Sequence, residues 1–85
     1  MEKYIVYVIT IDEVYDFETF DHSPEVYAVF DDAKRRFDDL VAQTREEFAE
    51  NEFDESQGDT FYETWENGRW PENHYGIYVH TVDLQ

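Results

Sequence analysis

The most strongly patterned stretch of the chain is an apolar run close to its start. Residues 4–11, YIVYVITI, are β-branched or aromatic almost throughout, and both alternating sets of positions are apolar. This pattern predicts a central strand that is covered on at least one side. Residues 12–24 carry five acids and three aromatics and end on Ser23-Pro24, so we expect a long loop, part of which could form an edge strand.

The next two elements are a short strand and a long helix. Residues 25–30, EVYAVF, alternate weakly and predict a second strand. Asp31 or Asp32 can then cap a helix, because apolar residues recur after them at spacings of three and four. The stripe expected to face the sheet consists of Ala33, Phe37, Leu40, Val41, Thr44 and Phe48. The basic cluster Lys34-Arg35-Arg36 has acids three and four positions away, which are expected to neutralise it.

The second half of the chain predicts a hairpin. Residues 50–59 form a polar connection with Gly58 as its breaker, and residues 60–66, TFYETWE, alternate as a strand does. Asn67-Gly68 is the strongest hairpin signal in the chain. The return strand is expected at residues 75–84, YGIYVHTVDL.

These elements predict one α+β domain over residues 1–85. The simplest packing is a small two-layer sandwich, in which a three- to four-stranded, mostly antiparallel sheet carries one long helix on one face. The bare face of that sheet would then hold many of the aromatic side chains.

Composition supports a folded, acidic domain. The chain has 22 Asp and Glu against 6 Lys and Arg, a net charge of -16, and yet 41% hydrophobic and 19% aromatic residues, which is too many for the disordered class. It has no cysteine, so disulfides and thiolate metal sites are excluded. The apolar run is too short to span a bilayer and has no basic leader, so we expect a cytoplasmic protein that does not bind membranes.

The motifs do not predict catalysis. Asp54, Ser56 and Gly58 have the alternation of an EF-hand loop, but Trp65 occupies the position of its bidentate glutamate. The three histidines, His22, His74 and His80, lack metal-ligand spacing, and carboxylate pairs arise by chance in so acidic a chain. We therefore expect a non-enzymatic protein without a cofactor or metal ion.

The charge points instead to a basic partner. A compact domain of this length is about 30 Å across, and duplex DNA of that length carries about 18 phosphates. A net charge of -16 is comparable. Direct nucleic-acid binding is thus disfavoured, and the expected partner is a basic, nucleic-acid-binding protein.

Two segments without Lys or Arg carry most of this charge, residues 12–32 with eight acids and residues 46–68 with nine. If both lie on one side of the fold, they make one continuous negative surface. The acids expected to contact a partner are Asp16, Glu18, Asp21, Glu46, Glu47, Glu50, Glu52, Asp54, Glu55 and Asp59.

In size, charge and lack of catalytic motifs, the chain resembles the small acidic inhibitors that phages and mobile elements direct against restriction or CRISPR enzymes. The resemblance is one of composition, with no shared motif. It implies a nucleic-acid mimic whose carboxylates stand in for phosphates in the basic groove of an enzyme.

An adapter or assembly subunit is the alternative function. Trp65, Trp70 and Tyr78 would then anchor a protein partner on an exposed aromatic sheet face, and the acids would keep that face soluble. Plain solubility and adaptation to high salt also account for the acidity. The sequence leaves the partner's identity and the oligomeric state open.

Overall fold

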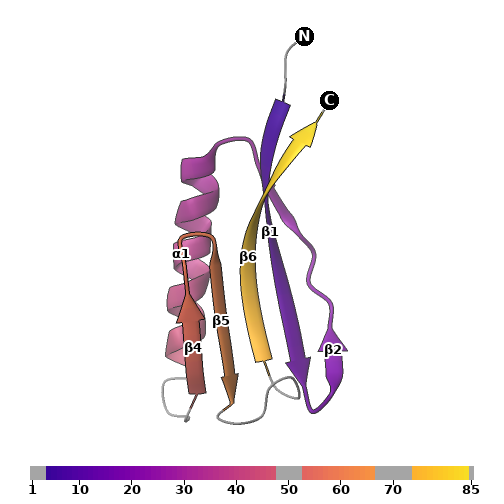
Figure 1. Ribbon diagram of the computed structural model, residues 1–85, viewed down its shortest axis with the longest axis vertical. Helices are drawn as coiled ribbons and strands as arrows, with labels where there is room; N and C mark the ends of the chain where they lie inside the picture. The colour runs from indigo at the N-terminus through magenta and orange to yellow at the C-terminus, as the bar shows by residue number, and fades with distance from the viewer. Residues whose placement is uncertain (1–3, 48–52, 67–73, 85) are drawn as a thin grey trace.

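A computed structural model describes residues 4–47, 53–66 and 74–84 of the chain, and every structural statement below concerns these residues. One helix lies against a six-stranded sheet (Figure 1). The α+β class and the helix on one face are confirmed, while the expected three or four strands were too few. The elements are β1 (Tyr4–Tyr15), β2 (Glu18–Phe20), β3 (Glu25–Tyr27), α1 (Phe30–Glu47), β4 (Phe53–Gln57), β5 (Phe61–Glu66) and β6 (His74–Leu84).

The sheet is built around its two longest strands. The strand order is β2-β1-β6-β5-β4, with β3 also pairing β1, and every pairing is antiparallel. β1 and β6 pair continuously from Tyr4 opposite Leu84 to Val14 opposite His74. The hairpin expected from β5 into the last strand is present as an antiparallel β5–β6 pair, although its Asn67-Gly68 turn lies outside the described residues.

Two segments predicted as loops are partly strands. β1 continues to Tyr15 and turns back into β2, where residues 12–24 were expected to be mainly loop. β4 lies within the predicted polar connection 50–59 and pairs with β5. Edge pairing uses backbone groups, so polar segments without an apolar pattern can join a sheet. Conversely, β3 ends at Tyr27, earlier than predicted.

α1 begins at Phe30, before both residues that were expected to cap it. Asp31 and Asp32 therefore lie in its first turn and Arg45 in its last. These charges interact favourably with the helix dipole. The stripe Ala33, Phe37, Leu40, Val41 and Thr44 is buried as predicted, whereas Phe48 lies outside the described residues.

The core lies between α1 and one face of the sheet. Phe37, Leu40 and Val41 of the helix form a buried cluster with Ile9, Tyr62 and Ile77 of three adjacent strands. Because side chains alternate along a strand, the remaining strand positions point to the opposite face, over which no other element of the described chain packs. This uncovered face carries Val6, Val8, Thr10, Asp12, Val14, Phe61, Glu63, Trp65, Gly76, Tyr78, His80 and Val82.

The molecule is elongated, with extents of 49 × 22 × 18 Å and a radius of gyration of 14.3 Å. β1 and β6 cause this shape because their terminal residues continue past the helix as a two-stranded ribbon (Figure 1). We call residues 4–6 and 82–84 the ribbon end. Most of its apolar side chains are exposed, among them Tyr4 at 64%, Ile5 at 45% and Leu84 at 47%.

Candidate partner-binding surface

Parts of both acidic segments identified in the sequence lie at the end of the molecule opposite the ribbon. The β1–β2 hairpin, the C-terminal end of α1 and the start of β4 all lie there (Figure 1). We call this the hairpin end. The predicted contact acids that lie at this end are Asp16, Glu18, Glu46, Glu47 and Asp54, and all five are exposed.

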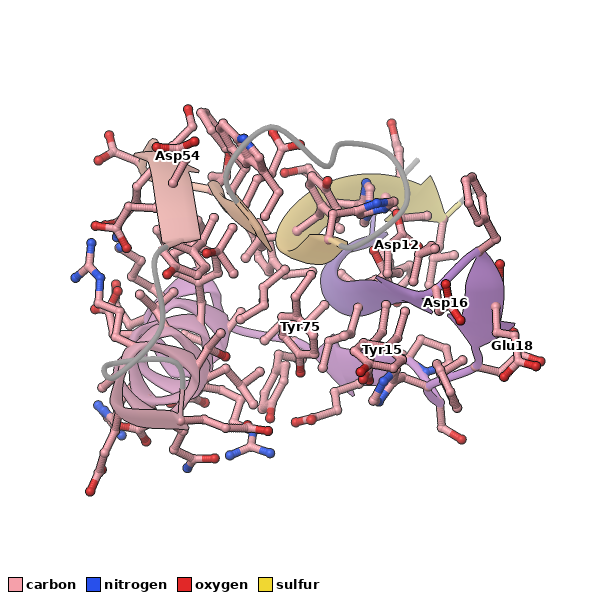
Figure 2. All side chains as sticks on the ribbon, turned by 90° about the horizontal axis from the view of Figure 1, so that it is seen from below. Asp12, Tyr15, Asp16, Glu18, Asp54 and Tyr75 are labelled. Atoms are coloured by element: carbon pink, nitrogen blue, oxygen red, sulfur yellow. The ribbon has the colours of Figure 1, made fainter. Side chains whose placement is uncertain are left out.

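Figure 2 looks at the molecule from the hairpin end. Asp16 and Glu18 lie on one side and Asp54 on the other, with Asp12 between them (Figure 2). Asp12 was not among the predicted contact residues, although it belongs to the same acidic segment, residues 12–32, as Asp16 and Glu18. Its even spacing from Val8 and Thr10 was the signal that it shares their face of a longer strand.

The tip of the hairpin is conformationally strained. Tyr15 pairs with Glu18, so the turn has two residues, and both Asp16 (φ 52°) and Phe17 (φ 66°) have positive φ. This fits a type I′ turn, in which Asn-Gly is favoured. Aspartate tolerates positive φ because its short polar side chain can hydrogen-bond locally, whereas the same conformation costs phenylalanine about 1–2 kcal/mol. Phe17 is 70% exposed, so burial does not offset that cost.

Each described cation is paired with an acid of its own chain. The pairs are Lys34–Asp38 at 2.8 Å, Arg35–Asp32 at 3.9 Å, Arg36–Glu25 at 3.0 Å and Arg45–Glu55 at 3.1 Å. The neutralisation expected for the cluster at 34–36 is therefore observed, with Glu25 of β3 as the partner of Arg36. Within the described part of the chain, the negative surface contains no Lys or Arg without an acid beside it.

Two of these pairs fasten the helix to opposite edges of the sheet. Arg36 donates to both carboxylate oxygens of Glu25 in β3, at 3.0 and 3.3 Å, and Tyr27 donates to the same carboxylate. Arg45 donates likewise to Glu55 in β4. These hydrogen bonds from arginine, with a tyrosine hydroxyl as second donor, lower the pKa of both glutamates.

Glu55 therefore has a structural role within the protein. It was predicted as a contact residue, but it accepts hydrogen bonds from Arg45 and from Tyr62, whose ring lies 5.3 Å from the Arg45 guanidinium carbon. Asp59 is exposed but lies in the β4–β5 turn, at the far end of that hairpin from Asp54 (Figure 1). Asp21 directly follows β2 and is exposed, while Glu50 and Glu52 lie outside the described residues.

The predicted aromatic surface is represented by Trp65 and Tyr78. Both are half-buried on the uncovered face, and Trp70 lies outside the described residues. A Cβ added at Gly76 would lie 2.5 Å from the Tyr78 hydroxyl, so the tyrosine ring covers this glycine. Burial, followed by the charge of nearby Glu63, raises the pKa of Tyr78 to about 12.

The histidines make isolated polar contacts. His22 Nε2 lies 2.7 Å from a carboxylate oxygen of Glu13, and His80 Nε2 lies 2.7 Å from the Thr10 hydroxyl. Across residues 4–47, 53–66 and 74–84, no group of three or more His, Asp or Glu is placed to hold a metal ion. The segment with EF-hand-like alternation is strand β4 followed by a turn.

Comparison with protein-family models, curated proteins and solved structures finds no match to this chain. None of the described residues form a helix that is both long and apolar enough to cross a membrane.

Proposed function

We propose that this protein is a non-catalytic acidic binding protein whose hairpin end occupies the basic groove of a nucleic-acid-binding protein, as a nucleic-acid mimic. The observation that carries the proposal is the gathering of Asp16, Glu18, Glu46, Glu47 and Asp54 at one end from three separate elements. Such a surface attracts a basic groove and steers it into register.

The charge density supports one kind of nucleic acid over another. A net charge of -16 along a 49 Å molecule is one charge per about 3 Å. That spacing is close to the 3.4 Å of a single strand and about twice the 1.7 Å of a duplex. Because the molecule is elongated, its charge per unit length is lower than the duplex-like value expected for a compact domain. Grooves that hold a single strand therefore fit the protein best.

The internal ion pairs support the same proposal. Arg36 and Arg45 are held by acids that fasten the helix, so the exposed acids of the hairpin end keep their charge for a partner. Inhibitors of restriction or CRISPR enzymes are the class of protein to which this function belongs.

Affinity capture from a cell lysate, with three forms of the protein as bait, tests the proposal. The first is the unchanged chain and the second carries Asp16→Lys and Glu18→Lys at the hairpin end. The third carries Asp39→Lys and Asp59→Lys, which make the same change in net charge away from that end. A nucleic-acid-binding protein should be retained by the first and third baits and lost from the second.

The partner so identified is then purified and its affinity measured against salt. We expect binding to weaken steeply between about 0.05 and 0.5 M salt, and single-stranded DNA or RNA to compete for the same site. Equal loss from both charge-reversed baits would indicate net charge without a specific surface. Binding that ignores salt and competitor would contradict mimicry.

An adapter function is the second candidate, favoured by the uncovered face with its half-buried Trp65 and Tyr78. A partner on that face is held mainly by apolar contact, so its binding should change little with salt. Tyr78→Ala should weaken an adapter complex and leave a mimic complex unchanged.

A further inference from the structure

β6 has a strand neighbour on both sides for only part of its length. β5 pairs with it from Trp65 opposite His74 to Phe61 opposite Tyr78, and the Val79 N–H then donates to the Thr60 carbonyl at 2.8 Å. Beyond this point β1 remains on one side. No described strand lies on the other side of residues 80–84, HTVDL, which are all exposed.

This edge differs in its charge from the edges formed by β2, β3 and β4. β4 presents Asp54 and Glu55, β2 presents Glu18, and β3 presents Glu25. Proteins commonly guard strand edges against pairing with such charges. Residues 80–84 hold one acid in five positions, and apolar Val82 and Leu84 stand beside it, 36% and 47% exposed. The edge of β6 thus carries a smaller share of acids than the edges of β2, β3 and β4.

We propose that residues 80–84 pair antiparallel with the same residues of a second copy of this chain, about a two-fold axis at Val82. The two sheets then continue as one across the dimer. Pairing of like segments about a two-fold axis is self-complementary by symmetry, and it closes without leaving a further edge of the same kind.

The alternating direction of the backbone N–H groups along β6 sets this register. Val79 directs its N–H toward the β5 side, and alternate residues of a strand direct theirs the same way, so Thr81 and Asp83 face the second copy. With Val82 on the axis, Thr81 of each copy lies opposite Asp83 of the other. That arrangement is a hydrogen-bonded antiparallel pair, formed twice.

Neighbouring registers with the same parity are worse. An axis at Asp83 places two carboxylates directly opposite each other, which is destabilising. An axis at Thr81 brings the second copy against Val79, whose N–H is already donated to Thr60. The register at Val82 avoids both and joins the valines of the two copies on the uncovered face.

A second copy is a suitable occupant in spite of the net charge of -16. In the two-fold pair the hairpin ends point away from each other, at the far ends of two molecules that are each 49 Å long. Charges are screened over about 8 Å at physiological salt, so the hairpin acids repel weakly across the dimer. A basic extended peptide would be drawn to the acidic edges formed by β2, β3 and β4.

The dimer does not depend on the proposed mimicry, and the two respond to salt in opposite directions. Added salt screens the repulsion between two acidic copies and should strengthen the dimer, whereas it should weaken binding to a basic groove. The ribbon end can therefore be tested with the protein by itself.

Sedimentation velocity of the whole chain, over a range of concentrations at about 0.05, 0.15 and 0.5 M salt, measures the association. We expect a monomer–dimer equilibrium that shifts toward dimer as salt rises. A monomer at every concentration and salt would overturn the proposal, as would a dimer that salt dissociates.

Matched variants locate the interface. Val82→Glu places like charges together on the axis, and Val26→Glu adds the same charge at an exposed residue of β3 on the same sheet face. The first should abolish the dimer and the second should leave it intact, with circular dichroism showing that both fold. Equal effects of the two would overturn the assignment.

Thr81→Pro tests the backbone pairing directly. It removes an N–H that points away from β1, so the β1–β6 pairing is kept. Two intermolecular hydrogen bonds are lost by symmetry, and we expect dimerisation to weaken by about tenfold or more. A folded variant that dimerises as the unchanged chain does would exclude pairing along this edge.

Discussion

β1 and β6 each run through two environments, and side chains of the same kind are buried in one and exposed in the other. Beneath α1, Ile9 and Ile77 are 1% and 0% exposed. At the ribbon end, four residues along β1, Ile5 is 45% exposed. The apolar run is uniform across this boundary, so the helix decides which of its residues become core. Apolar residues that the fold does not cover remain available to a partner.

The largest expected effect comes from truncating the same residue type on the two sides of the boundary. Ile9→Ala leaves a cavity against the helix and should lower the free energy of unfolding by about 2–5 kcal/mol. Ile5→Ala, in the same strand and pointing to the same face, should lower it by about 1 kcal/mol or less. Urea unfolding of both variants measures the contrast, and equal losses would mean that the helix does not set the boundary.

The dependence of stability on alkaline pH tests the part of the sheet where β6 has β1 and β5 on its two sides, because Tyr78 lies there. Its pKa is raised from the ordinary value of 10.0 to about 12, so the folded state holds the phenolic proton more tightly. The resulting stability is present below pH 10 and is lost as pH rises toward 12. Thermal unfolding at several pH values should show a smaller alkaline loss in Tyr78→Phe. Parallel pH profiles would contradict the raised pKa.

The hairpin end should respond to substitution at its strained tip. Phe17→Gly removes a side chain that disfavours positive φ and should raise the stability by about 1 kcal/mol. Thr19→Gly, in the extended strand that follows, should lower it by a similar amount because glycine is costly in strands. A loss of stability in Phe17→Gly would show that the ring makes a contribution that its 70% exposure does not suggest.

The smallest effect is expected at the ion pair between β3 and the helix. Glu25→Gln should cost about 1 kcal/mol or less at neutral pH, because the Glu25 and Arg36 side chains are 34% and 37% exposed and solvent screens the pair. The pKa of Glu25 is lowered by Arg36, so its contribution is present above about 4.5, the ordinary value, and is lost as pH falls through the lowered pKa. Urea unfolding at several pH values should show the two proteins converging in acid. A constant difference would indicate that packing, and not charge, is lost.

Periodicity predicted the elements with strong side-chain patterns. The strand from Tyr4, the stripe from Ala33 to Thr44 and the pairing of β5 with the last strand are all present. β2 was anticipated only as a possible edge strand within residues 12–24, and β4 was missed. Glu18–Phe20 and Phe53–Gln57 are held by backbone pairing at a sheet edge, which leaves no apolar alternation to detect.

The sequence predicted that the candidate site is acidic, but it predicted less well which acids belong to it. Asp16, Glu18, Glu46, Glu47 and Asp54 were identified as acids of two charged segments, and their exposure agrees with a contact role. Glu55 could not be distinguished from them, since its partners Arg45 and Tyr62 meet it only when β4 aligns beside β5 and the helix. Asp12, in the same charged segment as Asp16 and Glu18, was not selected, and the strand that carries it extends further than predicted.

By itself, the sequence determined the fold class, the helix stripe and a net charge of -16, because these depend on residue type and local spacing. The tertiary structure decided where the acids lie, which of them pair with Arg36 and Arg45, and which apolar residues stay exposed at the ribbon end. Those properties depend on where strands end relative to the helix and to each other. Long-range backbone pairing sets these positions, and side-chain patterns along the chain do not encode them.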